Sequence, residues 1–259
     1  MKKSMATIIG ILGVALLVGC SSGSTTSSQT SAAASDEKVY IFATDTHFPP
    51  FEFTDSNQDF VGIDVDILDA IAVDQGFSYQ LNSLGFDAAL TAVQTGQADA
   101  IIAGASITEE RKEIFDFTDA YYDSEVTMAV AQNSDVTSFA DLSGQTVAVK
   151  TGTMGSNFAK SIQEEYGFEI VEFSDSPTMY QDVIAGNTVA CFEDYPVMAY
   201  NIKNGAQLVI PEDCLGTGSQ YGVGVMKGEN AELIEMFNAG LANIKANGTF
   251  DEIVDKYTK

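Results

Sequence analysis

Short apolar runs that look like strands alternate with helical patterns from residue 39 to residue 257. We expect strands at Val39–Ala43, Tyr79–Leu81, Ala100–Ala103, Glu125–Ala131, Thr146–Val149, Glu169–Phe173, Val189–Phe192, Gln207–Ile210 and Tyr221–Met226. We expect helices at Ile63–Val73, Phe86–Thr95, Asn157–Tyr166, Met179–Ala185, Asp194–Asn204, Glu229–Asn247 and Phe250–Tyr257. Strands that alternate with helices in this way indicate an α/β architecture.

The expected strands Ala100–Ala103 and Val189–Phe192 end in similar surroundings. Each follows a helix that stops at a glycine, and each runs toward polar residues. These are Ser106 and Arg111 after one strand, and Glu193 and Asp194 after the other. Open α/β sheets bind ligands at the carboxyl ends of their strands, so two such sheets facing each other would form a binding cleft.

Arg111 is the only arginine in the chain, and it follows a small-residue loop containing Gly104 and Ser106. Thr108, followed by acidic residues, predicts that a helix begins here. A guanidinium group at a strand end can bind a carboxylate through two parallel hydrogen bonds, which lysine cannot reproduce. The alternative is a purely structural ion pair with one of three nearby acids, Glu109, Asp116 or Asp119.

The chain is globular in composition and strongly acidic. It carries 12 Lys and Arg against 37 Asp and Glu, a formal net charge of −25. Such a surface repels nucleic-acid phosphates and anionic lipid headgroups, so we expect no nucleic-acid binding. The simplest explanation of the acidic surface is that it keeps the protein soluble.

Signatures of enzymes are nearly absent. His47 is the only histidine and lies beside two prolines, which excludes a histidine-rich metal site. No Gly-x-Ser-x-Gly elbow and no phosphate-binding glycine motif follows a strand. The acidic segment Asp55–Asp59 lacks the glycine and glutamate of a calcium loop, so it predicts a polar turn. We therefore expect no catalysis, no cofactor and no metal.

The first twenty residues have the character of a targeting segment. Lys2 and Lys3 precede an apolar stretch, Ala6–Val18, that is short for a membrane span. The stretch ends Leu-Val-Gly-Cys, which resembles a bacterial lipobox and implies cleavage after Gly19 and lipidation of Cys20. The alternative is an ordinary secretory cleavage site with a chance cysteine.

Residues 20–37 are expected to form a lipid-bearing tether, because ten of the fifteen residues 21–35 are Ser or Thr. We expect the folded body to begin near Lys38. Leader, lipid site, tether and body in this order predict an extracytoplasmic protein, anchored to the bacterial membrane at the cell surface or in the periplasm. Cys191 and Cys214 remain, and in such a compartment they could pair or stay as buried free thiols.

A site for a zwitterion fits the polar residues at the strand ends. Arg111 would take a carboxylate, helped by backbone amides of the glycine-rich segment Gly152–Gly155 at a helix start. Asp194 would take an ammonium group, and Phe48 and Phe86 would flank the ligand. Taken singly, these residues have simpler roles as a tight turn, a helix cap and core packing.

Six motifs in order then resemble the polar amino-acid-binding proteins of ABC importers, the extracellular solute-binding proteins of family 3. The motifs are Asp45–Phe53, Val61–Asp66, Ala103–Arg111, Phe115–Thr118, Val149–Thr153 and Glu193–Pro196. The resemblance covers Val39 to about Tyr257.

The resemblance implies a two-lobed, type II periplasmic-binding-protein-like α/β fold that closes on a free amino acid in the cleft between the lobes. The first lobe would be residues 38–123 plus 224–259, and the second residues 124–223. The implied partners are the amino acid, an ABC permease in the cytoplasmic membrane and the membrane itself through Cys20, and we expect a monomer.

Carried over onto matching positions, the family's site assigns the ligand's head group to both lobes. Arg111, Gly104 and Ser106 would hold the α-carboxylate together with the Thr153–Met154 backbone. Asp194, with the same Gly104 and Ser106, would hold the ammonium group. Asp45 and Lys150 contact the ligand side chain in glutamine-binding relatives, and Asp45 also does so in relatives that bind basic amino acids. The full expected ligand-binding set is Asp45, Phe48, Phe86, Gly104, Ala105, Ser106, Arg111, Lys150, Thr153, Met154, Glu193 and Asp194.

Two departures bear on the ligand. Met154 occupies a place where relatives often have threonine or lack a residue, and Glu193 stands where some glutamine binders have histidine. The extra acid could favour arginine or lysine, or it could point outward. The run Ala103–Ser106 and Lys150 favour glutamine, so we expect glutamine first and basic amino acids second. A sensing or adhesion lipoprotein on the same fold, without transport, is an alternative of another class.

Overall fold

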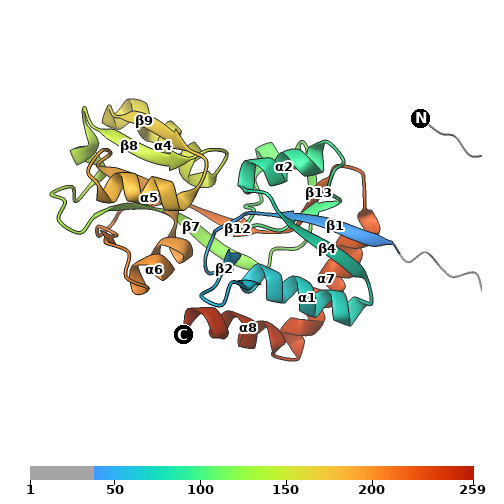
Figure 1. The fold of residues 1–259 in the computed structure, drawn as a ribbon. Coiled ribbons are helices and arrows are strands. Elements are labelled where there is room, and N and C mark those ends of the chain that lie inside the picture. Colours follow the sequence, from blue (N-terminus) through green and yellow to red (C-terminus); the bar gives the residue numbers. More distant parts are fainter. Residues whose placement is uncertain (1–37) are drawn as a thin grey trace, which may run out of the picture. The chain divides into compact units, whose positions relative to one another are not determined.

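The computed structural model describes residues 38–259, which form two α/β lobes, each built on its own sheet (Figure 1). The expected leader, the lipid site at Cys20 and the tether lie outside the described residues and stay predictions. No helix within residues 38–259 is long and apolar enough to cross a membrane.

The first sheet has five strands. Its order is β4 (Ser78–Ser83), β1 (Val39–Thr44), β5 (Ala100–Ile101), β13 (Gly224–Met226) and β6 (Phe115–Phe117). β1 is parallel to β4 and β5, whereas β13 is antiparallel to both of its neighbours. The helices of this lobe are α1 (Ile63–Gln75), α2 (Phe86–Gln94), the short α3 (Glu109–Lys112), α7 (Ala231–Ala246) and α8 (Thr249–Thr258). A small hairpin of β2 (Phe53–Thr54) and β3 (Phe60–Val61) encloses the polar turn expected at residues 55–59.

The second sheet has six strands. Its order is β11 (Leu208–Val209), β7 (Tyr122–Ala131), β10 (Ala190–Asp194), β8 (Thr146–Lys150) and β9 (Glu169–Phe173), and β12 (Leu215–Tyr221) also pairs with β7. The helices here are α4 (Met154–Tyr166), α5 (Ser176–Ile184), α6 (Tyr195–Lys203) and the 3₁₀ turn η1 (Phe139–Leu142).

The antiparallel strands β7 and β12 connect the two lobes (Figure 1). At one end, Tyr221 of β12 belongs to the apolar core of the first lobe. Farther along β7, Val126 and Met128 belong to the core of the second lobe. Two crossing strands that join two α/β lobes make this the two-lobed, type II arrangement that the motifs implied. We keep the exact lobe boundaries, near residues 123 and 224, as a proposal.

Two helices begin earlier than their sequence patterns predicted. α4 begins at Met154 rather than Asn157, because the Thr153 hydroxyl caps it by accepting the Ser156 amide. α5 begins at Ser176 rather than Met179, because Asp175 accepts the Thr178 amide in the same way. In both cases small polar residues start the helix, and the apolar pattern becomes visible only one turn later.

The expected strand Tyr221–Met226 was wrong as a single element. Tyr221 ends β12 in one lobe's sheet, and a new strand, β13, starts at Gly224 in the other. Most of β12 was not expected, because Leu215–Tyr221 contains two glycines and no apolar alternation. Pairing with β7 holds it in strand form. The apolar run at Ala100 is also a shorter strand than predicted, ending at Ile101.

Cys191 and Cys214 are both free and buried. Cys191 packs with Met179 and Met198, while Cys214 packs with another cluster around Phe192. Of the two alternatives left open by the sequence, the structure has free thiols.

Candidate functional site

A small cleft of about 280 Å³ lies where strand ends of the two lobes meet. It is lined by Asp45, Phe48, Phe86, Ala103, Gly104, Ser106, Arg111, Lys150, Thr153, Met154, Glu193 and Asp194. The structure thus brings together every residue of the expected set except Ala105. Ala105 is buried in the same core cluster as Phe86 and does not line the cleft, whereas Ala103 does.

Arg111 lies on α3 and spans the cleft. Its Nη1 donates to the Ser106 carbonyl at 2.7 Å, and its Nη2 donates to the Gly152 carbonyl of the second lobe at 2.9 Å. The guanidinium also stacks over the Phe86 ring, 5.1 Å from its centroid. Thr108 caps α3 as expected, since its hydroxyl accepts the Arg111 amide. Among the described residues Arg111 forms no ion pair with the three nearby acids, so its positive charge remains available to an anion.

The first turn of α4 faces the cleft. The Thr153 hydroxyl is occupied as a cap and by the Lys150 carbonyl, to which it donates at 2.8 Å. The first amides of a helix have no acceptor within the helix and carry partial positive charge. Gly155 lets this turn approach β10 closely, because a Cβ there would lie 2.5 Å from the Phe192 carbonyl oxygen. The turn therefore offers backbone donors for an anion beside Arg111.

Asp194 ends β10 and directly precedes α6, but its side chain makes no capping hydrogen bond to that helix. Instead its Oδ2 accepts a hydrogen bond from Tyr221 at 2.5 Å, and the Tyr221 oxygen lies 3.0 Å from the Ser124 hydroxyl. Burial and the adjacent Glu193 raise the pKa of Asp194 to about 7, while Tyr221, Arg111 and Lys150 act in the opposite direction. A buried carboxylate beside a guanidinium can bind an ammonium group if it is ionised.

Asp45 and Lys150 form an ion pair across the cleft, at the ends of β1 and β8. Each side chain is only 2% exposed. Lys150 lies over two aromatic rings, 4.9 Å from the centroid of Phe48 and 5.7 Å from that of Phe86. The pair of opposite charges is thus held in an aromatic, desolvated environment, where each charge strongly affects any polar group placed beside it.

Glu193 does not point outward. It is 2% exposed, and its Oε2 accepts from the Ser176 and Tyr180 hydroxyls at 2.7 and 2.8 Å. Its Oε1 accepts the Asp194 amide at 3.0 Å. Burial acts to lower the pKa of Lys150, but the charges of Asp45 and then Glu193 outweigh it and raise that pKa. Glu193 therefore contributes negative charge to the cleft from a fixed position.

Several contacting residues were not expected from the sequence: Ala103, Ser124, Ser176, Tyr180 and Tyr221. They come from four separate segments, and no local pattern marks them. Tyr221 ends a glycine-rich strand, and nothing in its local sequence indicates that its hydroxyl reaches Asp194 in the other lobe.

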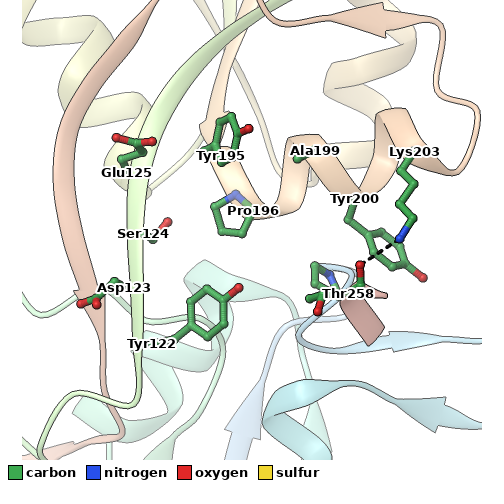
Figure 2. A pocket seen from close by; sticks show the side chains of 11 residues that line it. Tyr122, Asp123, Ser124, Glu125, Tyr195, Pro196, Ala199, Tyr200, Lys203 and Thr258 are labelled. Carbon is green, nitrogen blue, oxygen red and sulfur yellow. Dashed lines mark hydrogen bonds between the residues drawn. The ribbon is translucent and has the colours of Figure 1, made fainter. Parts of the chain in front are cut away.

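A second, larger hollow of about 960 Å³ lies beside the crossing strand β7 (Figure 2). It is bordered by Tyr122, Tyr195 and Tyr200, and Lys203 donates nearby to the Thr258 carbonyl at 2.8 Å. It contains none of the expected site residues. Residues 38–259 also hold no group of three or more His, Cys, Asp or Glu side chains suited to a metal ion.

Comparison with known proteins identifies the family. Residues 40–259 match the model of the bacterial extracellular solute-binding proteins, family 3. The chain belongs to this family. One relative, the histidine-binding periplasmic protein of Salmonella typhimurium, is 31% identical over 89% of this chain and 92% of its own length.

Solved structures of similar proteins support the same family 3 fold. Substrate binding domain 2 of Lactococcus lactis GlnP, in an open conformation, is 44% identical with a TM-score of 0.61, covering 86% of this chain and 96% of its own. An ancestral arginine-binding protein bound to arginine is 32% identical with a TM-score of 0.79, covering 85% and 98%. The arginine-bound structure is less similar in sequence but matches this chain better than the open structure does. The lobes of this chain also contact each other across the cleft, through Arg111 with Gly152 and through Asp45 with Lys150.

Proposed function

We propose that this protein captures a free polar L-amino acid outside the cytoplasmic membrane and delivers it to an ABC permease. Glutamine is the favoured ligand. Membership of family 3 and an arginine-containing cleft between two lobes support the proposal. Lipidation of Cys20 as a membrane anchor is part of the same proposal and rests on the sequence.

The head group of an amino acid matches the polar groups of the cleft. Arg111 and the first-turn amides after Thr153 would hold the α-carboxylate. Asp194 would hold the ammonium group with the backbone of Gly104 and the hydroxyl of Ser106. Because these groups belong to both lobes, the ligand would bind the closed arrangement better than an open one and thereby drive closure. Micromolar affinity, about −8 kcal/mol, is within reach of two charge-assisted contacts and several amides.

The ion pair of Asp45 and Lys150 is the observation that favours glutamine. A primary amide carries both an acceptor oxygen and donor hydrogens, so it can satisfy Lys150 and Asp45 at once. A guanidinium or ammonium side chain could pair with Asp45 only while facing the Lys150 charge. Arginine or lysine is the second candidate, and the fixed negative charge of Glu193 favours it.

A thermal-shift panel with all twenty amino acids tests the proposal. A ligand that binds only the folded state raises the melting temperature by mass action. With ligand at about 100 times its dissociation constant, the free energy of unfolding increases by about 2.7 kcal/mol. We expect this for glutamine, with smaller or no shifts for arginine and lysine. No shift with any amino acid, in protein freed of carried-over ligand by refolding, would contradict the proposed function.

Replacing Tyr221 with phenylalanine should weaken ligand binding about 10-fold and move its pH dependence. The ammonium group requires ionised Asp194, so affinity should rise with pH through the range around 7. Tyr221 donates to that carboxylate and favours its ionised form. Without the hydroxyl the pKa of Asp194 rises further, and the affinity curve should shift to higher pH.

Calorimetric titration from pH 6 to pH 8 measures this shift. Tyr122→Phe is the matched control, because Tyr122 stacks on Tyr221 at 6.0 Å on the same pair of strands. Its hydroxyl has no hydrogen bond to Asp194. If the two variants give superimposable curves, Tyr221 has no influence on the ammonium site.

A further inference from the structure

Glu52 is a buried carboxyl group that the ligand site does not use. Its side chain is 0% exposed, and neither carboxyl oxygen receives a hydrogen bond from an N–H or hydroxyl donor. The backbone around it is well ordered, since its amide and carbonyl pair with Phe48 across a tight turn. A carboxylate buried without donors is very unfavourable, so the protonated acid is the stable form unless a cation is in contact.

The neighbour of Glu52 is another buried carboxyl group, Asp64, in the first turn of α1. The two segments touch closely: the Asp64 amide donates to the Phe51 carbonyl at 2.9 Å. A Cβ on the intervening Gly62 would lie 2.0 Å from the Phe51 carbonyl oxygen and 2.8 Å from the Glu52 nitrogen. Both oxygens of Glu52 and the Oδ1 of Asp64 are buried without any other hydrogen-bond partner, so a hydrogen bond between the two side chains would satisfy both of them. Two carboxyl groups can form such a bond only if one of them carries a proton.

Asp64 is the better stabilised of the two as a carboxylate. Its Oδ2 accepts the Gly104 amide at 2.7 Å and the Tyr121 hydroxyl at 2.8 Å, and its Oδ1 has no such donor. Its place in the first turn of a helix also favours negative charge. Burial raises the pKa of Asp64 to about 6, whereas burial, Asp64 and Asp45 raise that of Glu52 well above its ordinary value. The proton therefore belongs on Glu52 and the charge on Asp64.

Gly104 connects this pair to the ligand cleft. It lines the cleft with a φ of +51°, and a Cβ there would lie 2.7 Å from the Phe48 ring. Its amide points away from the cleft into the Asp64 carboxylate. The orientation of the peptide before Gly104 is thus fixed from behind by a charged acceptor.

We propose that Glu52 keeps its proton at neutral pH and donates a hydrogen bond to the Asp64 carboxylate, and that the pair positions the Gly104 backbone at the wall of the cleft. The pair then carries one negative charge instead of two. The other titratable groups facing it are Tyr121, Asp45 and the lysine that pairs with Asp45, Lys150. The consequence for ligand binding rests on the proposed function, whereas the shared proton does not.

Glu52→Gln in the full chain tests the proton. Unfolded Glu52 loses its proton near pH 4.5, whereas folded Glu52 keeps it, so this residue lowers the stability of the native protein progressively as pH rises above 4.5. Glutamine does not titrate and can still donate to Asp64. The melting temperature of the variant relative to the wild type should therefore increase by about 5 °C or more between pH 4.5 and pH 8.

Glu212→Gln provides the control, because it makes the same change at an exposed side chain. Infrared spectroscopy gives a second readout: a protonated carboxyl band at pH 7 in the wild type that is weaker in Glu52→Gln. A melting-temperature difference between the two proteins that stays constant with pH, or an equally strong band in both, would overturn the proton assignment.

Ligand affinity tests the positioning. Asp64 is the acceptor that holds the Gly104 amide. Asp64→Ala removes that acceptor and should lose 10-fold or more in affinity. Equal affinities in folded Asp64→Ala and wild type would contradict the positioning role. If no amino acid binds the wild type, the proposed function fails while the stability and infrared results still decide the shared proton.

Discussion

Replacing Arg111 with lysine is expected to reduce amino-acid affinity by at least about 100-fold, although the positive charge is kept. The guanidinium reaches the Ser106 carbonyl in one lobe and the Gly152 carbonyl in the other while lying over Phe86. A lysine ammonium can neither bridge these groups in one plane nor give two parallel hydrogen bonds to a carboxylate. Arg111→Ala should abolish binding and leave the fold intact.

Calorimetry with glutamine measures the loss, and circular dichroism checks the fold. Lys112→Ala is the matched control on the same short helix, because Lys112 pairs with the exposed Glu109 and is not among the residues that line the cleft. A folded Arg111→Lys protein with wild-type affinity would remove Arg111 from the carboxylate site.

Replacing Lys150 with methionine is expected to change both stability and ligand preference. Lys150 is the cation that faces buried Asp45, and its charge also interacts with Glu193 and Glu52. Removing one partner of a buried ion pair leaves an uncompensated charge, which costs about 3–5 kcal/mol. Without the lysine charge, the buried acids Asp45 and Glu193 should favour a ligand with a cationic side chain. The ratio of glutamine affinity to arginine affinity should fall by at least about 10-fold.

Chemical denaturation and competitive titration with the two amino acids measure these effects. The double variant Asp45→Asn with Lys150→Met separates them, because it also removes the unpaired charge. It should regain part of the lost stability and should not gain arginine binding to the same extent. An unchanged ligand preference in Lys150→Met would show that the pair does not select the side chain.

The positions of most elements followed from local patterns. The helix ending at Gly76 and the long C-terminal helices α7 and α8 have apolar residues at helical spacing, and they lie where they were expected. The Thr108 cap before Arg111 was equally local. The elements that failed depend on distant partners. β12 is a strand because β7 pairs with it, and nothing within Leu215–Tyr221 predicts that pairing.

The expected site divides in the same way. Arg111 and Asp194 have a distinctive chemistry at a strand end and could be chosen from the sequence alone, whereas Lys150 was chosen through the family motif. All three line one cleft. Ala105 was chosen only by its place in a motif, and it faces the core. Tyr221 could not be chosen, since its hydroxyl acts on a residue 27 positions away.

The sequence by itself determined the alternation of strands and helices, the strand ends that carry charge and the family. These properties depend on short-range periodicity and on the chemistry of single side chains. Only the tertiary structure decided which charges meet. Asp45 faces Lys150 across 105 positions, Glu193 is held by two hydroxyls, and Asp64 accepts the Gly104 amide across 40. The strength and sign of such effects depend on burial and distance, which exist only once the lobes have folded.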